Sequence, residues 1–269
     1  MAASYAVTPS RQVDSENFKM SLAPVFLSPA LPSELLTYII SKCAYPTTLI
    51  VCSTRTDFLA SLTNDVLHQI QPEDPEEKRG EPEDLEEGGP PSTIIVQNTP
   101  GAHLLAAPLF QVAVAKHIRI VFVPTVSHLR VFLSLFGVTR TNVTAPPQLP
   151  HAQVRDTQNT PLLFVFGFLD LHRDTSEWSA QGLSNTAAAL VDAAREARLR
   201  AVILEPTRHG GERNSLESVV EESVPVLSSS ARRAAADLEE GGWTGRTVPV
   251  RRVLGRWFRF REGDWAKPV

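Results

Sequence analysis

Cysteine is scarce in this sequence. The 269 residues include two cysteines, Cys43 and Cys52, and seven scattered histidines. Two thiols make no disulfide framework, and neither they nor the histidines are spaced as zinc ligands are. We therefore expect two reduced, buried thiols of an intracellular protein, and no metal site.

Long apolar runs and a large net charge are lacking as well. No uninterrupted apolar run nears the roughly 20 residues that cross a bilayer. Residues 1–20 lack the basic-then-apolar order of a signal peptide. A net charge of −4 gives no whole-chain attraction to nucleic acids or membranes. These absences predict a soluble nuclear or cytoplasmic protein with no membrane partner.

The usual catalytic motifs are absent too. The sequence has no G-x-x-x-x-G-K-[ST] phosphate loop, no G-x-G-x-x-G after a strand and no G-x-S-x-G. A nucleophile site can be assembled only from residues that are ordinary in a solvated loop: Ser176 or Ser179, His172, and Asp170 or Asp174. Glu205 ends a strand-like run and has no evident partner in the sequence. We therefore expect a protein that is not an enzyme and has no cofactor.

Two segments differ in composition from the rest of the chain. Residues 1–20 are polar and irregular, which predicts a disordered tail. Residues 71–92 include nine acids between Glu73 and Glu87. Such a segment buries too little apolar surface to offset its ordering entropy. The sequence thus predicts one domain over 21–269 with a disordered acidic insertion at about 71–92, an acidic docking segment being the functional alternative.

The remaining chain alternates strand-like and helix-like segments. Four short apolar runs predict strands: 47–54, 117–124, 161–169 and 200–206. Amphipathic or alanine-rich segments predict helices between them: 55–70, with Phe58, Leu62 and Val66 on one face beside Leu59 and Leu67; 127–137, capped by Ser127 and ended by Gly137; and 184–200. Near-continuous apolar strands joined by helices predict an α/β fold with a mostly parallel sheet and helices on both faces.

The C-terminal part follows a different pattern. Residues 247–262 suggest one or two short strands, with Pro249 and Gly255 as breaks. This segment is therefore expected to form a hairpin or an antiparallel edge.

The order of these segments resembles the ATPase core of the RecA-like recombinases and their paralogues. The resemblance covers about residues 22–265 and rests on six stretches: "FLSPALPSELLTYIISKC", "LIVCSTRTDFLASL", "IRIVFVPTVSHLRVFL", "LLFVFGFLDLHRDTSEWSAQGLS", "RAVILEPTRHGGER" and "TVPVRRVLGRWFRFREGD". By this resemblance, the first three stretches correspond in order to the phosphate-loop strand and helix, the catalytic-glutamate segment, and the next strand and helix. The last three correspond in order to the magnesium-site strand, the strand before the second DNA loop, and the terminal strands.

Three departures from the family pattern concern ATP chemistry. The phosphate-loop position, Ser28–Glu34, has two prolines and neither glycine nor lysine, so it lacks N–H donors that cradle phosphate. Phe166 replaces the magnesium-binding acid, and the expected glutamate falls at Thr54 or Arg55. The resemblance therefore implies a non-hydrolysing member in which Phe166 is a core residue.

A basic segment near the C-terminus is the candidate nucleic-acid surface. Residues 246–261 contain six arginines and no acid, interleaved with Trp257, Phe258 and Phe260. Arginine forks suit phosphates and aromatic faces stack on bases. The candidate residues here and in the second DNA-loop position are Arg208, Arg213, Arg251, Arg252, Arg256, Arg259 and Arg261. The alternative is an edge strand in which Leu254, Phe258 and Phe260 pack inward, while Trp257 and the arginines face solvent.

The resemblance implies a function without ATP hydrolysis. The chain is similar to the degenerate recombinase paralogues of Shu-type complexes, which assist recombinase filaments on single-stranded DNA during homologous recombination. The partner would then be another RecA-fold protein, with Arg173 and Trp178 as candidate contact residues. Two alternatives stay open: a RecA-fold scaffold of an Elongator-type tRNA-modification complex, and a small-molecule enzyme on an unrelated α/β sheet.

Overall fold

The computed structural model describes residues 23–42, 46–70, 109–137, 161–207, 215–227 and 246–265. The predicted tail at 1–20, the predicted insertion at 71–92, Cys43, Arg208 and Arg213 all lie outside these residues. In chain order the described elements are β1 (Val25–Leu27), α2 (Pro32–Lys42), β2 (Thr47–Val51), α3 (Arg55–Ile70), α5 (Leu109–Ala115), β3 (Ile118–Phe122), α6 (Val126–Leu135), β4 (Leu162–Phe166), α7 (Phe168–His172), α8 (Ala180–Glu196), β5 (Arg200–Leu204), α9 (Leu216–Val220), β6 (Ser223–Pro225), β7 (Thr247–Pro249), α11 (Val250–Leu254) and β8 (Arg259–Arg261).

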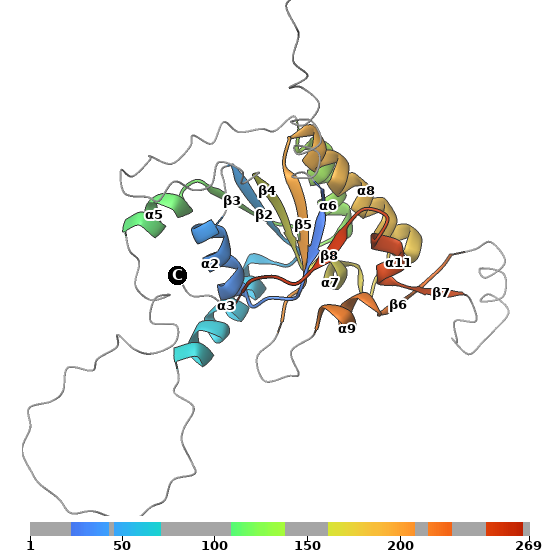
Figure 1. Cartoon of the computed structure of the whole chain (residues 1–269), viewed down its shortest axis with the longest axis horizontal. Helices are drawn as coiled ribbons and strands as arrows, with labels where there is room; N and C mark the ends of the chain where they lie inside the picture. Colours follow the sequence, from blue (N-terminus) through green and yellow to red (C-terminus); the bar gives the residue numbers. More distant parts are fainter. Residues whose placement is uncertain are drawn as a thin grey trace, which may run out of the picture.

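A six-stranded sheet forms the centre of the molecule (Figure 1). Its strands follow the order β3-β2-β4-β5-β1-β8, and every neighbouring pair is parallel. The four apolar runs predicted as strands are β2, β3, β4 and β5. The predicted α/β fold with a mostly parallel sheet is therefore confirmed.

Helices cover both faces of this sheet, as Figure 1 shows. Strand alternation sends Leu163 and Val165 to the face that α6, α8 and α11 cover, where the larger core cluster lies. It sends Phe164 and Phe166 to the opposite face, where α2 and α3 cover a smaller cluster. The continuous apolar strands are thus explained by burial on both faces.

The helix boundaries differ from the prediction where a hydroxyl caps the first turn. The N-cap of α6 is Thr125, whose Oγ1 accepts from the His128 amide at 3.2 Å, so Ser127 is not the cap. Helix α8 begins before the predicted Ser184, because Ser179 Oγ accepts from the Gly182 amide at 3.0 Å. On α3, Phe58 is buried as predicted, whereas Leu59 and Leu67 are exposed.

The C-terminal prediction needs a correction. An antiparallel pair exists, but β7 forms it with β6. The expected hairpin within 247–262 is wrong, because α11 separates β7 from β8. Helix α11 brings the chain back to the sheet, and β8 lies parallel to β1 at its edge. Within the described ranges, no helix combines the length and apolarity needed to cross a membrane.

Candidate functional site

The position of a phosphate loop, between β1 and α2, is filled by contacts within the chain. The Ala30 amide donates to Glu205 O at 3.0 Å, and the Thr207 amide donates to Ala30 O at 3.0 Å. Pro32, the first residue of α2, has no amide hydrogen to offer a ligand. The backbone here continues the sheet instead of cradling an anion.

A carboxylate of the chain itself occupies the amino end of α2. The Ser33 amide donates to Oδ2 of Asp65, from α3, at 2.8 Å, and Asp65 is 2% exposed. The Leu31 amide donates to Glu34 Oε2 at 2.9 Å. The amino end of a helix attracts anions because its amides are unpaired and its dipole is positive there. Asp65 thus occupies the amino end of α2, where an anionic ligand would otherwise find an unpaired amide.

The end of β4 carries no metal ligand. Phe166 is 5% exposed, and its ring packs against Phe58 with centroids 6.0 Å apart, so its predicted role as a core residue is confirmed. Gly167 then adopts a φ of 83° and turns the chain into α7. No group of three or more His, Cys, Asp or Glu residues in the described ranges is placed to hold a metal ion.

Glu205 closes the amino end of α7. Its Oε1 accepts from the Leu169 amide at 2.8 Å, and its side chain is almost fully buried. Burial raises the pKa of Glu205 to about 8, although the Leu169 amide and the charge of Arg173 lower it. Burial, followed by the charge of Glu205, raises the pKa of the Cys52 thiol well above its ordinary value. Cys52 is a buried free thiol, as predicted, and neither group is presented to solvent.

His172 belongs to a buried hydrogen-bond network. Its Nδ1 lies 2.7 Å from Phe168 O, and its Nε2 lies 3.0 Å from Thr186 Oγ1. Because a carbonyl only accepts, Nδ1 donates to Phe168 O, and the Thr186 hydroxyl itself donates to Gly182 O at 3.1 Å. Burial lowers the pKa of His172, which keeps the ring neutral. Arg130 Nε donates to the same hydroxyl at 3.0 Å. The serine of a nucleophile site is not among these partners, since Ser179 caps α8.

The two candidate partner-contact residues contact each other. The Arg173 guanidinium lies over the Trp178 ring, 5.6 Å from its centroid. Arg173 also donates two hydrogen bonds to Glu222, at 3.2 and 2.6 Å, and forms an ion pair with Asp170. These contacts fasten the loop after α7 to the segment that precedes β6.

The five candidate arginines between Arg251 and Arg261 fall into two groups. Arg251 forms ion pairs with Glu217 and Glu221 and lies over the Phe260 ring, so acids of the chain balance its charge. Arg252, Arg256, Arg259 and Arg261 differ. All four are exposed, and none of them forms an ion pair with a carboxylate of the described residues.

The aromatic residues of this segment point inward. Phe258 is buried, and Phe260 and Trp257 pack against the larger core cluster. The prediction for the phenylalanines is confirmed, but Trp257 does not share the outward face of the arginines. It lies in the turn before β8, where strand alternation does not apply. Arginines alone, without stacking aromatics, form the outer surface of β8.

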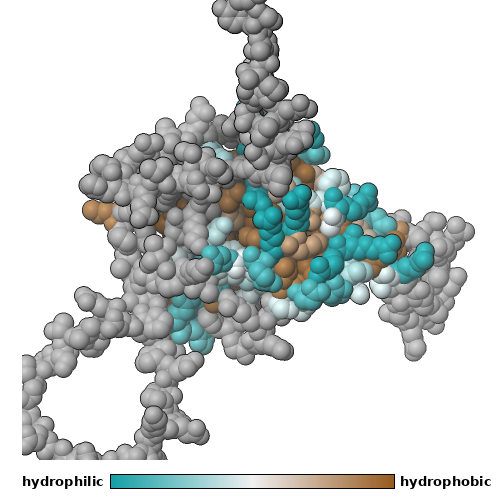
Figure 2. Space-filling view, viewed as in Figure 1, coloured by the Kyte–Doolittle hydropathy of each residue, from teal (hydrophilic) through white to brown (hydrophobic). Residues whose placement is uncertain are grey.

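Arg200, at the start of β5, joins the arginines of β8 on one face of the sheet. Val25 pairs with both Val202 and Arg259, and Leu27 pairs with Arg261, so these side chains share the α2 face. Burial, followed by the charges of Arg261 and Arg259, lowers the pKa of Arg200. Figure 2 shows hydrophilic residues gathered over β8 and α11. We call Arg200, Arg259 and Arg261, together with Arg256 in the turn before β8, the arginine patch. Arg252 lies on α11, which covers the opposite face of the sheet, and is not part of this patch.

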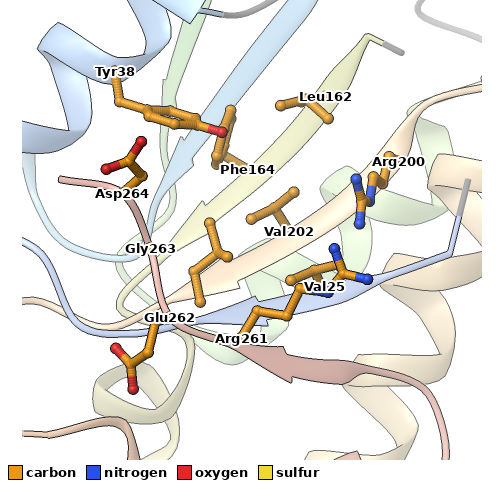
Figure 3. Close-up of a pocket in the computed structure, with 11 residues that line it drawn as sticks. Val25, Tyr38, Leu162, Phe164, Arg200, Val202, Arg261, Glu262, Gly263 and Asp264 are labelled. Atoms are coloured by element: carbon orange, nitrogen blue, oxygen red, sulfur yellow. The ribbon is translucent and has the colours of Figure 1, made fainter. Parts of the chain in front are cut away.

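A pocket of about 220 Å³ lies beside this patch, over β4, β5 and β1 (Figure 3). Apolar residues form its floor: Val25, Leu27, Leu162, Phe164 and Val202. Figure 3 shows Arg200 and Arg261 at one side of the floor and Asp264 beside Tyr38 at the other. The segment after β8 forms one wall, fastened by a hydrogen bond of 2.8 Å from the Gly263 amide to Ser28 Oγ.

Several of these residues were not predicted as functional. Asp65 is one acid within a helix, and nothing in its spacing shows that α3 lies against the start of α2. Arg200 opens an apolar run, and its proximity to Arg261 depends on β1 lying between β5 and β8. Neither the family models nor the curated proteins with which the chain was compared gave a match.

Proposed function

We propose that this protein is a non-catalytic subunit of RecA-like fold that binds single-stranded DNA and a partner protein in homologous recombination and DNA repair. The element order supports the resemblance: β1 and α2 stand at the phosphate-loop position, followed by the strand and helix pairs in the expected sequence. The proposal assigns the molecule a binding role and no hydrolysis.

The observation that carries the proposal is the occupancy of the amino end of α2 by Asp65. The Ser33 amide and the dipole of α2 are already satisfied by a buried carboxylate at 2.8 Å. A nucleotide phosphate at this position meets like charge from Asp65. The chain therefore keeps the layout of a nucleotide enzyme with its phosphate position closed.

The arginine patch supports the choice of a polyanionic ligand. Burial and, after it, the like charges of Arg261 and Arg259 lower the pKa of Arg200, although two acids, Glu262 and Asp264, follow β8. Phosphates of a nucleic-acid strand neutralise such clustered guanidinium groups, and binding then weakens as salt rises. An arginine fork binds phosphate oxygens in a bidentate manner.

Fluorescence anisotropy with a labelled single-stranded oligonucleotide tests the DNA-binding part. The wild-type protein is expected to bind with an affinity that falls steeply between 50 and 200 mM salt. The double variant Arg256→Ala/Arg259→Ala is expected to bind at least about tenfold more weakly, since two phosphate contacts are removed. The matched control is Arg55→Ala, an exposed arginine on α3. Equal binding by wild type and double variant removes the arginine patch from the proposal.

A further inference from the structure

The lining of the pocket beside the arginine patch has an apolar part and a charged part. The floor of the pocket is an apolar area of the sheet formed by alternate residues of β1, β4 and β5, in which Leu27 and Leu162 are the more exposed members, and Tyr38 of α2 lines one side. Two guanidinium groups, those of Arg200 and Arg261, lie at one side (Figure 3). Arg200 Nε donates to Ala23 O at 2.8 Å, which fixes this side chain over the start of β1.

The charges orient any ligand that enters. A ligand with an anionic end is attracted to Arg200 and Arg261. It is repelled by the two acids of the lining, Glu262 and Asp264, of which Asp264 lies beside Tyr38. Its other end then lies over Val25, Val202 and the Tyr38 side chain. The ligand class is thus a flat, largely apolar group joined to an anion.

The size of the pocket limits the ligand further. About 220 Å³ lies below the roughly 300–1,000 Å³ of sites that enclose drug-sized molecules, so a whole dinucleotide or nucleoside triphosphate is too large. A single base with its sugar is of suitable size, and its phosphate then lies at the rim of the pocket, where Arg261 is exposed. Arg259 lies two residues before Arg261, on the same face of the edge strand β8, where a phosphate of a neighbouring nucleotide can be bound.

We propose that this pocket holds one nucleotide of a bound single strand, with the base over the apolar floor beside Tyr38 and the phosphate at Arg200 and Arg261. This inference rests on the proposed binding of single-stranded DNA and adds the subsite at which the strand is anchored. The rest of the strand follows β8 toward Arg259 and Arg256.

Two substitutions separate the apolar and the ionic parts of the pocket. Leu162→Trp fills the pocket with an indole and changes no charge, because Leu162 is a half-buried residue of the floor. Arg261→Met removes one guanidinium and keeps the length of the side chain at an exposed position. The control for the first is Leu67→Trp, which places the same side chain on exposed α3.

The experiment is fluorescence anisotropy of a labelled 15-mer oligodeoxycytidylate at several salt concentrations, with circular dichroism to verify folding. Leu162→Trp is expected to weaken binding at least about tenfold with an unchanged slope of log Kd against log salt. Arg261→Met is expected to reduce that slope by about one, the effect of one phosphate contact. Leu67→Trp is expected to match the wild type.

Four results overturn the inference. If Leu162→Trp folds and binds like the wild type, or if Arg261→Met leaves the salt slope unchanged, the strand does not use the pocket, while the proposed DNA binding stands. If unlabelled deoxycytidine monophosphate competes as well as the oligonucleotide at equal nucleotide concentration, the ligand is a free nucleotide. If the wild type binds no strand at all, the proposed function fails together with the subsite.

Discussion

At the scale of single residues, Glu205 has the most unusual electrostatics. Its carboxyl ionises near pH 4.5 in ordinary surroundings, whereas burial raises the pKa to about 8 in the folded protein. The folded state therefore holds the proton more tightly than the unfolded chain. The protonated carboxyl of Glu205 therefore contributes to the free energy of unfolding in full below pH 4.5. This contribution decreases as the pH rises toward 8 and is lost above it.

The substitution Glu205→Gln tests this dependence. An uncharged amide keeps an oxygen that accepts from the Leu169 amide and has no proton to lose. In urea unfolding, the stability of Glu205→Gln relative to wild type is expected to rise by at least about 1.4 kcal/mol from pH 5 to pH 9, the linkage value of a single pKa unit. The control is Glu262→Gln, at an exposed carboxyl. A constant difference across this range contradicts the raised pKa.

Single residues also show what the sequence can predict. Phe166 was predicted as a core residue because an aromatic side chain within a continuous apolar run has no other stable place. The environment of His172 was not predicted, since its partners Phe168 and Thr186 lie on two helices whose packing is a tertiary property. Arg200 was missed for a similar reason: its pairing depends on which strands are neighbours.

At the scale of elements, a carboxylate of α3 closes the amino end of α2. Asp65→Ala removes the carboxylate that accepts from the Ser33 amide and from Gln69 Nε2, both at 2.8 Å. The free energy of unfolding is expected to fall by about 1–3 kcal/mol, because a buried donor loses its acceptor. Asp65→Asn keeps an oxygen at this place and is expected to cost less. Urea unfolding at pH 7 measures both, and equal losses contradict the assigned role of Asp65.

The strands and helices that could be predicted are those whose apolar residues follow a clear pattern along the sequence. Strands β2 to β5 and helix α3 follow from apolar runs and four-residue spacing. Helix α11 was not predicted, because Val250–Leu254 is only five residues long and follows Pro249, which the sequence marked as a strand break. It joins β7, which pairs with β6, to β8, which pairs with β1 in the parallel direction.

At the scale of the whole molecule, the two ends of the sheet differ. The β8 end carries the arginine patch. At the other end, the described residues pair β3 with β2 alone, and α6 lies beside β3, with Arg119 over the Phe132 ring. Val131 and Leu135, four residues apart on α6, are 58% and 50% exposed. Exposed apolar residues beside an edge strand are typical of a protein-binding surface.

The β3 end of the sheet is accordingly expected to contact the partner protein. Affinity purification of the double variant Val131→Glu/Leu135→Glu from the protein's own cells tests this expectation. Charges at these positions oppose apolar burial, so recovery of the main stoichiometric partner, expected to be another RecA-fold protein, is expected to fall at least about fivefold. The control is Leu67→Glu, an equally exposed leucine on α3. Undiminished recovery of the partner contradicts the assignment of this surface. Recovery of Elongator subunits instead contradicts the recombination function and favours the scaffold alternative, because the partner separates the two classes directly.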